Sequence, residues 1–272
     1  MMKLKKLDNN SGKKMGKTKA IRLLKIFIVL ILALGVLIVI AFSPLYAIKE
    51  IKALGSLKYT GDEIIRASGI RYGDNGFQGI GANPGSIFSL RNTNAEKAIL
   101  EKLPYIKDAT VKFIMPDKVE IHVIDREPHM MVSCLGAYLL VDNESYVLES
   151  FKEPVEGYPV VTGIDFSRYK LGQPLTCTNP DRLETAGKVI NAIIESDKTE
   201  RFKIYELVKS LDVEDVRNIR LFINGTLVAN LGDIKDIGYK ITFLKEAYFT
   251  SIKDTKGILD FTIGGNPTFR TR

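Results

Sequence analysis

The two histidines of this 272-residue chain are the first candidates for chemistry, because imidazole serves both as a metal ligand and as a general base. His122 falls at an outward position of an alternating segment, and His129 falls in a connecting segment just after a proline. Neither has a cysteine, aspartate or glutamate at the spacing of metal ligands. The spacing therefore predicts structural or solvated histidines and no metal site.

Hydrolase chemistry would need a nucleophile or a pair of acids. The sequence contains no Ser-x-x-Lys, Gly-x-Ser-x-Gly or His-Glu-x-x-His motif. Carboxylates are abundant but scattered, and spacing does not separate catalytic acid pairs from solvated charge. We interpret the cluster Asp125-Arg126-Glu127 as a salt-bridged junction between domains rather than as an active charge cluster. The sequence thus predicts no catalytic residue, no cofactor and no enzyme activity.

A glycine-rich segment, Gly76 to Ser86, could resemble a phosphate loop. Its glycines at 79, 81 and 85 do not follow the G-x-G-x-x-G spacing, and no strand-turn-helix pattern surrounds them. We therefore expect a flexible surface loop that folding does not require.

The helices and strands that would position these residues come after a long segment that contains no charged residue. No charged residue occurs from Ile26 to Ile48. A helix from Leu23 to Phe42 would reach roughly 30 Å, the thickness of a hydrocarbon core. A signal peptide is the competing interpretation, but its apolar region runs about 7–15 residues. Its best cleavage site, Ala41-Phe42-Ser43, would place Pro44 just after the cut. We therefore expect a single-pass anchor at 23–43.

The charge of the chain is concentrated before this span. Residues 1–25 carry nine Lys/Arg and one acid, Asp8, out of 39 basic and 32 acidic residues in all. The remainder is nearly neutral, so the basic pI does not point to nucleic acid. Lys/Arg enrichment marks the cytoplasmic flank of a span. We expect a basic cytoplasmic tail at 1–22, an extracytoplasmic C-terminal part, and orientation set by Lys17, Lys19, Arg22 and Lys25.

The two cysteines, Cys134 and Cys177, lie in the part expected outside the membrane. A disulfide persists in such a compartment. A bridge between them and a pair of buried free thiols both remain open.

The first unit after the anchor has the element order strand, helix, helix, strand, strand. Ile48 to Leu54 is the first strand, and capping boxes at Thr60–Glu63 and Thr93–Glu96 open two helices. Alternating segments at 109–115 and 119–123 follow, with Phe113 and Ile121 facing inward.

This order behind a single anchor resembles the POTRA domain of the FtsQ/DivIB family of bacterial cell-division proteins. Six stretches carry the resemblance in the same order: Phe42-Ser43-Pro44-Leu45-Tyr46, Ile51-Lys52-Ala53-Leu54-Gly55, Gly73-Asp74-Asn75, Ile87-Phe88-Ser89-Leu90, Glu101-Lys102-Leu103-Pro104-Tyr105-Ile106 and Asp125-Arg126-Glu127-Pro128. One departure is the segment Gly76 to Ser86, an insertion of 11 residues relative to the family pattern.

The fold class expected is therefore a single-pass membrane protein with an α+β ectodomain. A β-α-α-β-β POTRA domain is expected at 44–126. A mixed β domain that contains two helices follows at 127–263, and a C-terminal tail at 264–272 ends the chain. Within the second domain, Asn224-Gly225 predicts a hairpin, and helices are expected after Asn179-Pro180 and around Ile237 to Tyr248.

The resemblance implies a non-enzymatic scaffold of the divisome at the division septum. Such a protein links early components to the septal wall-synthesis machinery through FtsL and FtsB/DivIC-like bitopic proteins, and reaches septal peptidoglycan synthesis proteins. The alternative is a membrane-anchored extracytoplasmic binding or sensing module. An anchored wall hydrolase lacks a nucleophile or metal motif.

The final strand is the expected partner surface. Gly257 to Ile263 alternates in polarity, and Gly264 to Pro267 is expected to end it, so the strand is expected at a sheet edge open to strand addition. In the family the corresponding region receives the FtsB/DivIC partner. The opposing interpretation is an internal strand. The partner-binding residues expected are Ile258, Leu259, Asp260, Phe261, Thr262 and Ile263.

Overall fold

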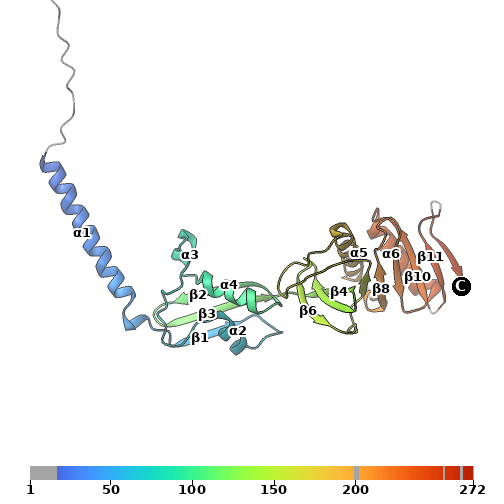
Figure 1. The fold of residues 1–272 in the computed structure, drawn as a ribbon, viewed down its shortest axis with the longest axis horizontal. Coiled ribbons are helices and arrows are strands. Elements are labelled where there is room, and N and C mark those ends of the chain that lie inside the picture. Colours follow the sequence, from blue (N-terminus) through green and yellow to red (C-terminus); the bar gives the residue numbers. More distant parts are fainter. Residues whose placement is uncertain (1–16, 199–201, 254, 264–265, 272) are drawn as a thin grey trace, which may run out of the picture.

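The computed structural model describes residues 17–198, 202–253, 255–263 and 266–271 (Figure 1). Most of the expected basic tail, residues 1–16, lies outside these ranges. Two sheet-containing domains follow an isolated N-terminal helix along the long axis of the molecule.

That helix, α1 (Lys17–Ala41), is long and apolar enough over Ile21–Ala41 to cross a membrane. Its apolar side chains are exposed rather than packed against the ectodomain, as expected of a helix that faces lipid. It ends two residues earlier than expected, because Ser43 caps a short 3-10 turn, η1 (Pro44–Tyr46).

The first domain holds a three-stranded sheet of order β1-β3-β2. Strand β1 (Glu50–Leu54) runs parallel to β3 (Lys118–Asp125), which pairs antiparallel with β2 (Ile106–Ile114). Helices α2 (Gly61–Ser68) and α4 (Thr93–Lys102) cover one face of the sheet. The expected inward residues Phe113 and Ile121 share one core with Ile64 and Ile99.

One of the two expected capping boxes is confirmed. Thr60 accepts from the amide of Glu63, whose carboxylate accepts from Thr60 N–H at 2.8 Å. The prediction of a capping box at Thr93–Glu96 is wrong, because Asn92 caps α4 by accepting from Ala95 N–H at 3.0 Å. Glu96 is buried and instead binds Arg91 and the amide of Val111.

The insertion is also different from the expected flexible loop. Phe77 packs edge-on against Tyr46 and Phe113, with ring centroids 5.0 and 5.2 Å apart. Gly76 lies so close to the Phe113 ring that a Cβ there would overlap it. The segment then enters a third helix, α3 (Pro84–Ser89), which the sequence analysis did not expect. The start of the insertion is therefore part of the core.

The second domain is built on a nine-stranded mixed sheet of order β12-β11-β10-β9-β8-β7-β4-β5-β6. Its strands are β4 (Pro128–Cys134), β5 (Ala137–Asp142), β6 (Val147–Phe151), β7 (Val160–Thr162), β8 (Val208–Asp212), β9 (Ile219–Ile223), β10 (Leu227–Gly232), β11 (Gly257–Asp260) and β12 (Thr268–Thr271). The pairs β4–β7, β7–β8 and β10–β11 are parallel.

Two helices cover one face of this sheet, α5 (Pro180–Lys198) and α6 (Ile237–Ala247). A π-helical turn, η3 (Tyr248–Ile252), continues α6. The expected hairpin between β9 and β10 is present, with Asn224 and Gly225 at φ 48° and 67°, the left-handed region that such a turn requires.

Two expectations about the C-terminus are wrong. The strand that begins at Gly257 ends at Asp260 rather than at Ile263, and it is internal because β12 pairs antiparallel with its outer side. The expected tail 264–272 contains that last strand. Gly264 and Gly265 lie outside the described residues.

Candidate partner interface and domain junction

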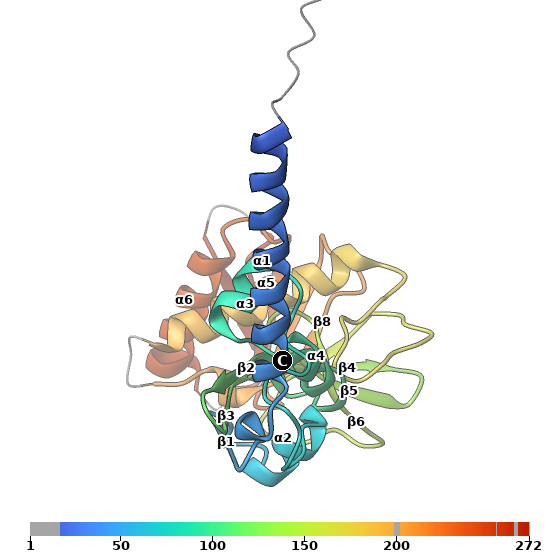
Figure 2. The same ribbon diagram turned by 90° about the vertical axis from the view of Figure 1, so that its left-hand side faces the viewer.

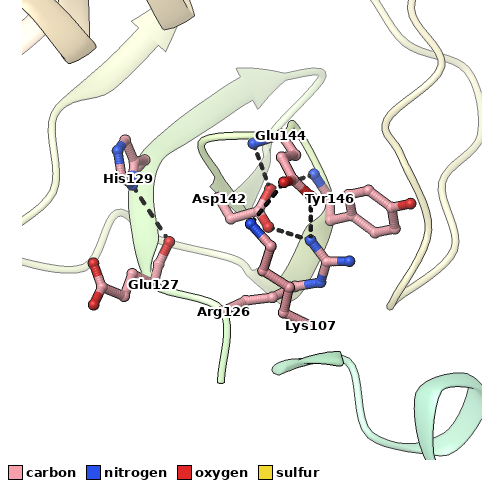
Figure 3. A network of polar contacts seen from close by, with 7 residues as sticks. All are labelled: Lys107, Arg126, Glu127, His129, Asp142, Glu144 and Tyr146. Atoms are coloured by element: carbon pink, nitrogen blue, oxygen red, sulfur yellow. Dashed lines mark hydrogen bonds and ion pairs between the residues drawn. The ribbon is translucent and has the colours of Figure 1, made fainter. Parts of the chain in front are cut away.

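The two domains meet at a polar junction centred on Arg126 (Figure 3). This residue follows β3, and only 8% of its surface is exposed. Its Nη1 donates to Asp142 Oδ2 at 2.6 Å and to Glu144 Oε2 at 3.1 Å, and its guanidinium lies 3.5 Å from the Tyr146 ring centroid. The expected salt-bridged junction is therefore confirmed at Arg126.

The carboxylates on the other side of this junction lie at the end of β5, Asp142, and in the turn after it, Glu144. Asp142 Oδ1 accepts from the amides of Glu144 and Tyr146 at 2.9 and 2.8 Å, so the turn is folded around the same side chain that binds Arg126. Lys107 of β2 adds an ion pair to Glu144 at 2.7 Å. Lys107 and Arg126 together hold the pKa of Glu144 below its ordinary value.

An aromatic contact reinforces the junction. The backbone carbonyl of Tyr105 accepts from Arg126 N–H, and the Tyr105 hydroxyl donates to Glu149 Oε2 at 2.7 Å. Burial, together with the bond to Glu149, raises the pKa of Tyr105. The ring packs in one cluster with Met131 and Leu140 of the second domain. These contacts join the two domains through both polar and apolar side chains.

Asp125, next to Arg126, serves the first domain instead. Its Oδ2 accepts from Ser56 Oγ and from the amides of Leu57 and Lys58, which fixes the turn after β1. Within the cluster, Asp125 thus holds the turn and Arg126 the junction, while Glu127 is exposed.

A buried ion pair positions the helices under the far part of the large sheet. Lys245 of α6 lies 2.9 Å from Asp197 Oδ1 of α5 and donates to the Ser196 carbonyl at 2.7 Å. Asp197 also accepts from the amides of Ile204 and Tyr205, so the pair fixes the chain that leads into β8.

The expected partner-binding residues divide by burial. Leu259 is buried in the core of the sheet and Ile258 is half-buried. Asp260 is buried, and its Oδ1 accepts from Thr262 N–H at 2.8 Å and from Thr262 Oγ1 at 2.6 Å. Burial opposes the charge, but bonds from Thr262 and Asn230 hold the pKa of Asp260 below its ordinary value. These residues support the strand from within.

The rest of the segment is closer to solvent. Phe261 is half-buried against Phe243 of α6, with ring centroids 5.9 Å apart. Thr262 is exposed, and Ile263 is 46% exposed although it is apolar. Thr262 and Ile263 are therefore the residues of the segment that a partner can reach.

Strand β12 forms the edge that the sequence analysis missed. It pairs with β11 from Gly257↔Thr271 to Asp260↔Thr268, and no described strand pairs with its other side. Phe269 lies over Gly257, where a Cβ would come within 2.6 Å of the ring. The β-branched Thr268 and Thr271 around Phe269 were the available sequence signal.

The orienting residues lie where the span begins. Lys17, Lys19, Arg22 and Lys25 fall in the first turns of α1, so this helix extends from the apolar span into the basic segment.

The other chemical candidates are separate from one another. Cys134 and Cys177 are free, half-buried thiols, and burial raises the pKa of Cys177. His122 lies on the exposed face of β3, 3.6 Å from Glu120. Within the described ranges, no group of three or more His, Cys, Asp or Glu residues is arranged to hold a metal ion.

These features define a class of protein: an apolar N-terminal helix suited to membrane anchoring, followed by a small β-α-β module and a larger sheet domain. Residues 46–126 match the family model described as "POTRA domain, FtsQ-type". The chain is 24% identical to cell division protein DivIB of Clostridium tetani over 245 residues. This aligned region covers 87% of this chain and 84% of that protein.

Further relatives agree. Cell division protein DivIB of Clostridium botulinum (strain Hall) is 25% identical over 93% of both chains, and cell division protein FtsQ of Corynebacterium glutamicum is 27% identical over 69% of this chain and 74% of its own. The chain thus carries an FtsQ-type POTRA domain and is homologous over most of its length to the DivIB and FtsQ cell division proteins. The resemblance seen in the sequence is confirmed.

Proposed function

We propose that this chain is a non-enzymatic divisome scaffold. It sits in the cell membrane at the division septum and links early components to the septal wall-synthesis machinery. Its direct partners are FtsL- and FtsB/DivIC-like bitopic proteins. Through these proteins it reaches septal peptidoglycan synthesis proteins. The observation that supports the proposal is a membrane-length apolar helix followed by two domains joined through Arg126, the second of which ends in β12, a strand with no described strand on its outer side.

The topology proposed is N-terminus in the cytoplasm and residues 44–272 outside. The basic residues before the span support it, because Lys/Arg on one flank retain that flank in the cytoplasm. A reporter active only outside the membrane should be active when fused at Arg272. Activity at Lys5 instead would contradict the topology, and release of a soluble ectodomain would indicate a cleaved signal peptide.

The partner surface we propose joins the outer side of β12 to the exposed part of the segment Ile258–Ile263. An edge strand offers unpaired backbone amides and carbonyls to an incoming strand. Thr262 and Ile263 lie between β11 and β12 in the chain and their side chains are exposed, so we include them in the surface that an added strand would contact. Leu259 and Asp260 act indirectly, by holding β11 in place for β12.

Photo-crosslinking in dividing cells tests this surface. Probes at Thr262 and Arg270, both exposed, should capture a small bitopic division protein. A probe at Lys112, exposed on β2 of the POTRA domain, is the matched control. Capture of that protein at Lys112 and at neither Thr262 nor Arg270 would move the interface to the POTRA domain. Depletion should give filaments with blocked septa, whereas ligand-dependent signalling without a septation defect would favour a sensing module.

A further inference from the structure

The insertion Gly76–Ser86 and the helix α3 that follows from it have no role in the function proposed above. The stretch 75–90 contains no charged residue. At its tip, Phe88 is 90% exposed and the adjacent Ile87 is 52% exposed. An aromatic side chain presented to solvent beside a second apolar one, in a stretch of sequence without charge, is typical of a surface that contacts something apolar.

The base that carries this tip is firmly built. Phe77 is held between the Tyr46 and Phe113 rings. Asn83 caps α3 by accepting from Ser86 N–H at 2.8 Å, and the Ser86 carbonyl accepts from Arg91 N–H at 2.9 Å. These contacts join the start of the insertion to the POTRA core and cap the helix that carries Ile87 and Phe88.

The same base is bonded to the end of α1. Asn75, the residue before the insertion, donates from Nδ2 to the carbonyl of Ala41, the last residue of α1, at 3.0 Å. Gly76 N–H donates to the Tyr46 carbonyl at 2.9 Å. Phe42 and Leu45 beside this contact are 65% and 60% exposed. The insertion thus starts at the point where the chain leaves the apolar helix.

The direction of α3 follows from the two views. In Figure 1, α1 leans to the upper left, and α3 stands above the POTRA domain, to the right of α1 and higher in the view than the lower end of α1. In Figure 2, turned by 90°, α3 again lies at the height of the lower part of α1. Consider a plane perpendicular to α1 through its lower end in Figure 1. The second domain lies on the side of this plane that faces away from α1.

We propose that Ile87 and Phe88 insert into the lipid surface of the membrane that α1 spans, on the side of the ectodomain. This inference rests on the proposed anchoring and topology. The occupant is the bilayer interface, because α1 must place lipid beside its own C-terminal turns and α3 reaches that level. Apolar and aromatic side chains are those that partition to this boundary. The contact is a second attachment, which limits rotation of the ectodomain about η1.

The absence of tryptophan from the chain makes a clean test available. Three single variants of the full chain, F88W, L57W and L32W, are reconstituted in phosphatidylcholine vesicles with brominated acyl chains. Leu57 is the matched control, because it is fully exposed in the same domain but lies beyond the far end of β1. Leu32 reports on α1 itself. Bromine quenches indole emission at contact, and an interfacial side chain sits roughly 5–10 Å deep.

We expect F88W emission to be quenched several-fold more than that of L57W, and most by bromines near the top of the acyl chains. L32W should be quenched most by bromines near the bilayer centre. Quenching of L32W with F88W unquenched and open to aqueous iodide would overturn the lipid contact while leaving the anchor intact. An F88W that is shielded from both quenchers would indicate a protein occupant, such as a second copy, and would also overturn it. An unquenched L32W would refute the proposed anchor itself.

Discussion

Replacement of Arg126 by methionine removes the charge at the centre of the domain junction while keeping much of the side-chain volume. Arg126 is 8% exposed and Asp142 is 1% exposed, so the variant leaves a buried carboxylate without its cation. Removing one partner of a buried pair costs about 3–5 kcal/mol. Asp142 keeps two backbone donors, which places the expected loss near the lower end, about 3 kcal/mol.

The chain contains a matched pair for comparison. Arg220 lies 2.6 Å from Asp212, the same distance as Arg126 from Asp142, but its side chain is 45% exposed. Exposed pairs contribute about 0–1 kcal/mol. Denaturant unfolding of residues 44–272 should therefore show R126M destabilised by about 3 kcal/mol and R220M by less than about 1 kcal/mol.

A double-mutant cycle with D142N isolates the interaction. R126M and D142N together should cost clearly less than the sum of the single changes, because each removes the same pair. Equal, small losses for R126M and R220M would refute the argument that burial makes the junction strong. Additive losses in the cycle would show that Arg126 stabilises through its contact with Tyr146 instead.

Three further predictions concern the POTRA domain and the junction. Phe113→Ala should cost about 3–5 kcal/mol by emptying the core, whereas Lys112→Ala should change stability by less than about 0.5 kcal/mol; similar melting temperatures would mean that β2 faces the other way. Deletion of residues 76–86 should lower stability by ~2 kcal/mol because it removes the Phe77 ring contacts, and an unchanged melting temperature would restore the surface-loop interpretation. The ion pairs of Glu144 lower its pKa, so they stabilise the fold above its unfolded value of about 4.3, and this contribution is lost as pH falls through the lowered folded value. Glu144→Gln should therefore flatten the acid side of the stability–pH curve, and identical curves would show that the pairs do not stabilise the fold.

Local signals predicted the elements well where the partners are local. Thr60 and Glu63 are three residues apart, and their capping box is present. The same pattern failed at Thr93–Glu96 because Glu96 reaches the amide of Val111, 15 residues away, in a neighbouring strand. A spacing rule contains no information about that competitor, and the buried amide decides the outcome.

The sheet edge shows the same limit on a larger scale. Gly264 to Pro267 was interpreted as the end of the last strand, but the chain returns after it to form β12. A turn signal does not say whether another strand follows, and four residues around Phe269 give a weak pattern. The order β8-β7-β4 likewise depends on parallel pairings between strands far apart in the sequence, which alternation cannot reveal. The POTRA domain was predictable because ordered stretches of the sequence matched a known pattern.

A series of contacts connects the end of α1 to the far edge of the large sheet. Asn75 bonds to the end of α1, Arg126 and Tyr105 lock the two domains together, and β12 lies at the opposite end of the molecule from α1 (Figure 1). With α1 spanning the membrane as proposed, such a series sets the height of β12 above the bilayer only when the joint between α1 and the ectodomain is also restrained. The chain through η1 and one hydrogen bond from Asn75 leave the ectodomain able to tilt, whereas a further contact through Phe88 would restrain that tilt. The proposed lipid contact and the proposed partner edge therefore act on one quantity, the distance from the bilayer at which β12 meets an incoming strand.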